Sequence, residues 1–122
     1  MNDKTKILYV DDESMNLLLF KRLFKDHYQI FTANSGNAGI EVLLSETGIR
    51  AVICDMKMPG MDGIEFATTA KKMFPETQFF ILTGFDFLPE ISKAMNSNTI
   101  VKYFSKPLNI NDITTSIDAA LK

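Results

Sequence analysis

Side chains that could hold a cation or a phosphoryl group stand where predicted strands end. Two acidic residues close the first apolar run, a third follows AVIC, a hydroxyl ends QFFILT, and a lysine follows VKYF closely: Asp11, Asp12, Asp55, Thr83 and Lys106. Carboxylates that share one crevice repel each other unless a cation joins them. Hard oxygen ligands favour Mg²⁺, while a lysine and a hydroxyl can neutralise and bind phosphoryl oxygens. Because a carboxylate can also be a nucleophile, these residue types suggest Mg²⁺-assisted phosphoryl transfer onto an aspartate.

Short apolar runs alternate with segments of helical period, and this alternation must position the strand-end residues. The predicted strands cover residues 6–10, 28–33, 51–54, 78–83 and 99–104. The predicted helices cover 14–24, 35–45, a segment from Asp62 to just before Pro75, 87–96, and a last segment from Asn109 to Leu121, with Ser14, Asp62 and Asn109 as N-caps. Five strand–helix units in a row predict an α/β fold, a doubly wound parallel sheet with helices on both faces. In such sheets the ligand site lies outside the carboxyl ends of the strands.

Length and composition predict one soluble domain spanning residues 1–122. The chain is 46% hydrophobic and 23% charged, and its 122 residues leave no room for two independent cores. A net charge of −2 gives no basic field for nucleic acid or anionic lipid. Cys54 is the single cysteine, which excludes an internal disulfide and is compatible with a reducing cytosol. We find no targeting segment and no membrane-spanning run, and we expect a cytoplasmic protein that binds neither membranes nor nucleic acids directly.

Four motifs, in the order of the predicted strands, resemble those of the receiver domains of two-component response regulators, whose chemotaxis members are single domains. The motifs are ILYVDDES, VICDMKMPGMDG, FFILTG and VKYFSKPL, and the resemblance covers nearly the whole chain. It implies a flavodoxin-like (βα)5 fold with strand order 2-1-3-4-5. It also implies a regulatory switch, not an enzyme, that accepts a phosphoryl group from a sensor histidine kinase or a phosphotransfer protein.

The resemblance assigns four residues to the metal and the phosphoryl group. Asp55 would be the phosphoacceptor and a metal ligand. Asp12 would bind Mg²⁺ directly, and Asp11 would help to hold the ion through water. The backbone carbonyl of Lys57 would be a further ligand.

The resemblance assigns another set of residues to the response. Lys106 would pair with a phosphoryl oxygen, placed there by a cis peptide before Pro107. Thr83 would move toward the phosphoryl group, and the rotamer of Tyr103 would follow it. In family terms this motion reshapes the face made by the fourth helix, fifth strand and last helix. A downstream protein target or an output domain would read that face, and the chain would be a monomer or a phosphorylation-dependent dimer.

Two positions that vary within the family bear on how long the phosphoryl group lasts. Lys57 lies two residues after Asp55, and Phe85 lies two residues after Thr83. Neither side chain is suited to orient an attacking water, because neither offers a carboxylate or an amide. The resemblance therefore leads us to expect slow self-dephosphorylation.

Other interpretations of the same residues remain open at this point. Asp55 could be a simple turn residue, and Tyr103 could be an ordinary strand aromatic. A small Mg²⁺-dependent phosphohydrolase also uses a strand-end aspartate, but that class has DxDx[TV] where this chain has DDES, and the chain lacks its inserted cap. A nucleotide-binding module would need a glycine-rich phosphate loop after a strand, and none is present. A degenerate receiver that only docks partners would not need the intact acidic residues, threonine and lysine.

Overall fold

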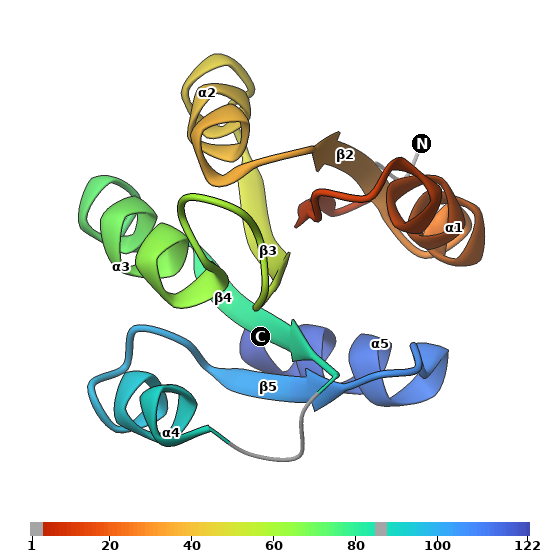
Figure 1. Cartoon of the computed structure of the whole chain (residues 1–122). Helices are drawn as coiled ribbons and strands as arrows, with labels where there is room; N and C mark the ends of the chain where they lie inside the picture. Colours follow the sequence, from red (N-terminus) through yellow and green to blue (C-terminus); the bar gives the residue numbers. More distant parts are fainter. Residues whose placement is uncertain (1–3, 85–87) are drawn as a thin grey trace.

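The computed structural model describes residues 4–84 and 88–122, in which five strands alternate with five helices (Figure 1). The strands are β1 Lys6–Val10, β2 Gln29–Ala33, β3 Ile49–Asp55, β4 Gln78–Thr83 and β5 Lys102–Ser105. The helices are α1 Ser14–Phe24, α2 Gly36–Ser45, α3 Gly63–Met73, α4 Pro89–Asn96 and α5 Ile110–Ala120. All neighbouring strands pair in parallel, in the order β2-β1-β3-β4-β5. The predicted α/β class and the strand order implied by the resemblance are both confirmed.

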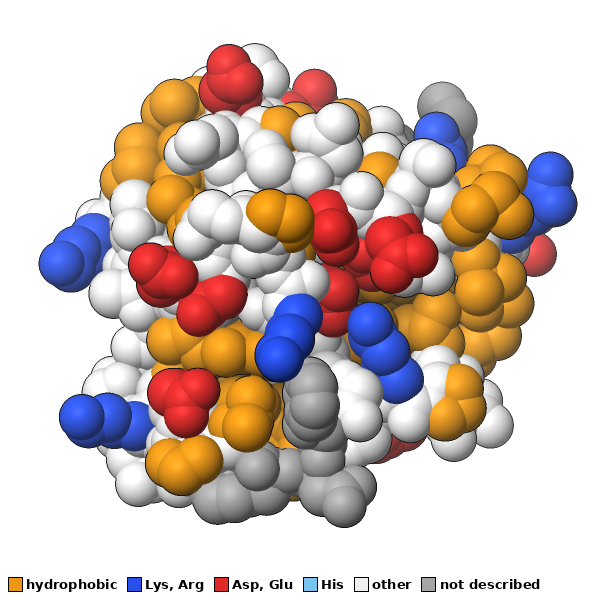
Figure 2. Space-filling view, viewed as in Figure 1, with side chains coloured by type: hydrophobic (Ala, Val, Ile, Leu, Met, Phe, Trp, Pro, Cys, Tyr) orange, Lys and Arg blue, Asp and Glu red, His pale blue; other side chains and the backbone are white. Residues whose placement is uncertain are grey.

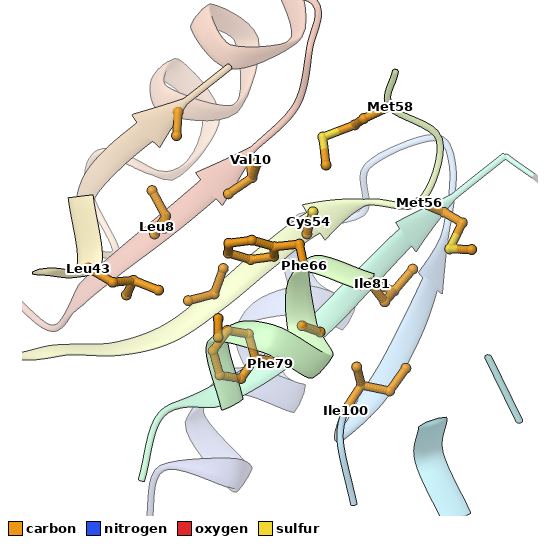
Figure 3. Packing of buried hydrophobic residues seen from close by; sticks show 14 of the residues in the cluster. Leu8, Val10, Leu43, Cys54, Met56, Met58, Phe66, Phe79, Ile81 and Ile100 are labelled. Carbon is orange, nitrogen blue, oxygen red and sulfur yellow. The ribbon is translucent and has the colours of Figure 1, made fainter. Parts of the chain in front are cut away.

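Helices cover both faces of the sheet, α1 and α5 on one side and α2, α3 and α4 on the other (Figure 1). Successive strand residues point to opposite faces, so β1 contributes Ile7 and Tyr9 to the α1 and α5 side and Leu8 and Val10 to the other. Figure 3 shows the buried cluster on the side of α2, α3 and α4, where Leu8 and Val10 lie near Phe66 of α3. Strands buried on both faces are near-continuously apolar, which is why the sequence shows these runs.

The first helix covers the predicted residues 14–24, but its N-cap is not the predicted residue. The N-cap is Glu13, not Ser14, because the Glu13 carbonyl accepts the backbone N–H groups of Asn16 and Leu17. Its own N–H donates to the carboxylate of Asp11 at 3.0 Å. An acidic residue before the helix thus fixes its start, and the prediction of a serine cap was wrong. Among the other predicted caps, Asp62 and Asn109 are confirmed, each side chain accepting a backbone N–H three residues ahead.

The strand that follows the fourth helix also differs from the prediction, whereas β4 covers the predicted residues 78–83. β5 begins at Lys102, three residues later than predicted, because the N–H groups of Thr99 and Ile100 both bond to the Ala94 carbonyl at the end of α4. At the other end of α4, Leu88 is the N-cap and Pro89 the first helical residue. The predicted start of this helix at Phe87 lies outside the described residues.

The register of the parallel strands brings their carboxyl ends to one edge of the sheet. Val10 is paired with Cys54, so the residues that follow each strand are neighbours. β3 continues one residue further than predicted, to Asp55, which pairs with Leu82. Thr83 in turn pairs with Ser105. The strand-end residues singled out by the sequence therefore share this edge.

The helices described here are short, since each has at most 11 residues. Across residues 4–84 and 88–122, none is long and apolar enough to cross a membrane.

Candidate functional site

Three carboxylates converge at the carboxyl edge of the sheet. Asp11, Asp12 and Asp55 each offer an oxygen, and these oxygens lie within 4.8 Å of one another. Asp11 and Asp55 are buried, while Asp12 is exposed. Figure 2 shows acidic side chains gathered at the centre of this face, with basic side chains beside them. The sequence prediction that these residues meet is therefore confirmed.

Lys106 completes the cluster from the far side. Its Nζ lies 3.0 Å from Oδ1 of Asp55, and its side chain remains 37% exposed. The backbone fixes this residue, because the Lys106 N–H donates to the carbonyl of Thr83 at 2.8 Å. The peptide bond to Pro107 is cis, as the resemblance implies. The same hydrogen bond brings the buried Thr83 beside Lys106 at the ends of β4 and β5.

Burial dominates the electrostatics of Asp55, because a carboxylate shielded from water loses solvation in its charged form. Burial raises the pKa of the Asp55 carboxyl, and the nearby charges of Asp11 and Asp12 raise it further. The hydrogen bond and charge of Lys106 lower this pKa but do not reverse the direction. A cation at this point would relieve the repulsion. All three donor groups are carboxylate oxygens, and this donor set fits a hard ion such as Mg²⁺.

The loop between β3 and α3 is shaped by close backbone packing. A Cβ on Gly63 would lie 2.7 Å from the Asp55 carbonyl oxygen, so only glycine lets the start of α3 approach the strand end. Gly60 has a φ of 79°, in the left-handed region that favours glycine. Met56 and Met58 are buried and anchor the loop in the core (Figure 3). Lys57, which lies between them in the sequence, is exposed. The loop thus packs closely against the strand end that carries Asp55, while the Lys57 side chain remains exposed.

The two residues predicted to respond to phosphorylation occupy different environments. Thr83 is buried at the end of β4. Tyr103 is half-buried on β5, opposite Ile81, and packs against the cluster that includes Ile91 of α4. Phe85, whose bulk entered the expectation about dephosphorylation, lies outside the described residues.

Two residues that sequence reasoning did not select touch the site through Asp11. The Tyr9 hydroxyl donates to Oδ2 of Asp11 at 2.7 Å, and Nδ2 of Asn16 donates to the same oxygen at 3.2 Å. Burial, followed by the hydrogen bond to Asp11, raises the pKa of Tyr9, so the hydroxyl keeps its proton. One signal was available in the sequence: residues two apart in an extended chain share a face, and Asp11 directly follows β1, so Tyr9 points the same way as Asp11.

Comparison with known proteins gives consistent matches over almost the whole chain. A family model described as "Response regulator receiver domain" matches residues 7–118. Sporulation initiation phosphotransferase F of Bacillus subtilis is 32% identical over 118 residues, covering 96% of this chain and 92% of that protein. The hydrogenase transcriptional regulatory protein HoxA of Cupriavidus necator is 28% identical, and the match covers 88% of this chain but only 22% of HoxA.

Solved structures give the same picture. A response regulator receiver domain protein from Clostridium thermocellum has 34% sequence identity and a TM-score of 0.88, with coverage of 95% of this chain and 93% of that one. The response regulator protein TrrA from Thermotoga maritima, solved in complex with Mg²⁺ and BeF, has 26% identity and a TM-score of 0.80, with coverage of 95% and 98%.

Proposed function

This chain belongs to the response regulator receiver domains, and on that premise we propose that residues 1–122 form a single receiver domain that is phosphorylated on Asp55. Receiver domains of two-component systems are phosphoacceptor switches that receive their phosphoryl group from histidine kinases. The observation that carries the assignment of Asp55 is its position between two acidic residues and Lys106, whose Nζ lies 3.0 Å from its Oδ1.

The chemistry of transfer follows from the groups at this edge. A carboxylate oxygen of Asp55 attacks the phosphorus of the donor and forms a new P–O bond, giving an acyl phosphate. The bond from phosphorus to the donor histidine nitrogen breaks, and that nitrogen keeps the electron pair. Lys106 is close enough to Asp55 to exchange its carboxylate contact for one with a phosphoryl oxygen, offsetting the incoming charge.

The same residues support a divalent cation. Asp12 and Asp55 would bind Mg²⁺ directly, Asp11 would act through water, and the backbone carbonyl of Lys57 would be the remaining protein ligand. The all-oxygen donor set supports this choice, as does the Mg²⁺ and BeF complex of the similar protein TrrA. When bound, Mg²⁺ would neutralise carboxylate charge and the charge that develops on the phosphoryl oxygens.

The response would be a coupled movement of Thr83 and Tyr103. Thr83 is buried beside Lys106, within the backbone-bonded ends of β4 and β5. Tyr103 packs on the α4 side of the sheet, so a rotamer change there would alter the face made by α4, β5 and α5. We propose that a downstream protein, or an output domain of the kind that longer relatives carry, reads this face. The chain would be regulatory, catalysing only its own phosphorylation and dephosphorylation.

Labelling with a small phosphodonor tests the proposal. The chain incubated with acetyl phosphate and Mg²⁺ should gain the mass of one phosphoryl group, seen by intact-protein mass spectrometry. With EDTA in place of Mg²⁺ the gain should disappear, because the three carboxylates would then repel the anionic donor. A chain that gains no mass with Mg²⁺, or an equal mass in EDTA, would contradict the proposed function or its metal dependence, respectively.

The lifetime of the aspartyl phosphate is a separate expectation, and it depends on Lys57. The Lys57 side chain is exposed beside the site and offers neither a carboxylate nor an amide to orient an attacking water. Lys57→Asn would introduce an amide that can orient water, and we expect the phosphoryl group to be lost roughly tenfold faster. Decay after removal of acetyl phosphate measures this, with Lys57→Arg as the control that should keep the slow rate. Equal lifetimes for Lys57→Asn and the parent chain would refute the expectation.

A further inference from the structure

The buried carboxylate of Asp11 is held almost entirely by the protein's own donors. Its Oδ2 accepts from the Tyr9 hydroxyl at 2.7 Å and from Nδ2 of Asn16 at 3.2 Å. Its Oδ1 accepts from the Glu13 N–H at 3.0 Å. An ionised carboxylate has about four acceptor positions, two on each oxygen. Three of these are therefore taken, and the remaining one is on Oδ1.

Both donors to Oδ2 are themselves fixed by α1. The ring of Tyr9 stacks on Phe20 with centroids 4.1 Å apart and an interplanar angle of 5°. Phe20 stacks in turn on Phe24, and all three rings are buried. Asn16 is the third residue of the same helix and lies in its first turn. The orientation of the Asp11 carboxylate thus depends on how α1 packs on β1.

We propose that Tyr9 and Asn16 are positioning residues for the metal site: by filling Oδ2 they orient Asp11 so that only Oδ1 is available to the cation or its bound water. The inference rests on the proposed function, because it takes Asp11 to be part of the Mg²⁺ site. A carboxylate freed from these two bonds can rotate, and groups that orient metal ligands contribute to affinity although they do not touch the ion. Neither residue would react with the phosphoryl group.

The test is the dissociation constant for Mg²⁺ of single variants, measured by isothermal titration calorimetry without a phosphodonor. Tyr9→Phe keeps the stacked ring and removes only the hydroxyl, and it should weaken Mg²⁺ binding about tenfold. Asn16→Ala removes the longer bond and should weaken it about threefold. Because both donate to one oxygen, the double variant should lose less than the product of the two factors.

Tyr28→Phe is the matched control. Tyr28 is a second buried tyrosine whose hydroxyl donates to an aspartate, Asp118, at 2.9 Å. It precedes β2, and so lies at the opposite end of the sheet from the site. Both tyrosine variants should lower the melting temperature of the metal-free protein, but only Tyr9→Phe should weaken Mg²⁺ binding.

The outcomes separate this inference from the proposed function. An unchanged Mg²⁺ affinity in Tyr9→Phe would overturn the inference. An equal loss of Mg²⁺ affinity in Tyr28→Phe would overturn it too, because it would show that any loss of fold stability weakens metal binding. If Tyr9→Phe does not fold, Asn16→Ala decides alone, because alanine favours the helix and parent-like affinity there would overturn the inference too. A parent chain that binds no Mg²⁺ would contradict the proposed metal site itself.

Discussion

Asp55→Asn should take up no phosphoryl group under conditions that label the parent chain completely. The substitution keeps the size and shape of the side chain but replaces a nucleophilic carboxylate with an amide. The other two carboxylates of the cluster cannot easily replace it as the nucleophile. Asp11 is buried, and three of its four acceptor positions are occupied by hydrogen bonds. Lys106 forms its ion pair with Asp55 and not with Asp12. Intact-protein mass spectrometry after treatment with acetyl phosphate and Mg²⁺ measures the result.

Asp62→Asn is the control for this experiment. Asp62 belongs to the same loop and caps α3 through the Glu65 N–H, a role that asparagine also fills. It should be labelled as fully as the parent chain. A phosphoryl group on Asp55→Asn that matches the parent level would show that another residue is the acceptor, and would contradict the central assignment.

Asp55→Asn should also stabilise the metal-free fold at neutral pH. Burial and the two neighbouring carboxylates raise the pKa of Asp55 in the folded state, so ionising this group costs folding free energy. For a raised carboxyl pKa, the cost appears as pH rises from the ordinary pKa through the folded-state value, and it persists above that value. The melting temperature of Asp55→Asn without Mg²⁺ should therefore exceed that of the parent at pH 7. The difference should vanish in acid, where Asp55 is protonated in both states.

The parts of the site that the sequence predicted are those that depend on topology. Asp11, Asp12 and Asp55 follow strands that must end at one edge of a parallel sheet, so their convergence needs no knowledge of side-chain packing. The alternation of apolar runs and helical segments was enough to predict this topology.

What the sequence did not predict depends on local geometry. The hydrogen bond from Tyr9 to Asp11 requires a particular rotamer, and that from Asn16 requires α1 to have Glu13 as its N-cap. The late start of β5 arises from backbone bonds to Ala94 that close α4, and no hydrophobic pattern records such bonds. The movement expected of Thr83 and Tyr103 is a difference between two states, so it stays a prediction.

Lys106→Ala should slow phosphorylation while leaving the nucleophile in place. Lys106 provides the cation 3.0 Å from Asp55, where negative charge accumulates as the phosphoryl group arrives. Removing one group that stabilises such charge costs roughly 100- to 1000-fold in rate. The initial rate of labelling by acetyl phosphate at saturating Mg²⁺ measures this effect. Lys106→Arg retains the charge and should recover part of the rate, limited by its different shape.

Lys102→Ala is the matched control, because Lys102 lies on β5 and is likewise paired with an aspartate, Asp112 at 3.4 Å, but away from the acidic cluster. Its labelling rate should equal that of the parent chain. A parent-like rate in Lys106→Ala would mean that the ion pair with Asp55 is structural and that the phosphoryl charge is offset elsewhere.

The affinity for Mg²⁺ should change in the opposite direction in Lys106→Ala. Lys106 repels a cation and also occupies Oδ1 of Asp55. In the variant, the three carboxylates would keep their negative charge without this lysine to neutralise it, and Oδ1 would be open to the metal. Mg²⁺ should therefore bind the variant more tightly even though the variant is phosphorylated more slowly. General damage to the site would weaken both properties together. The opposite signs follow only if Lys106 acts on the phosphoryl group while the carboxylates hold the metal, and calorimetry on the same protein sample distinguishes the two cases.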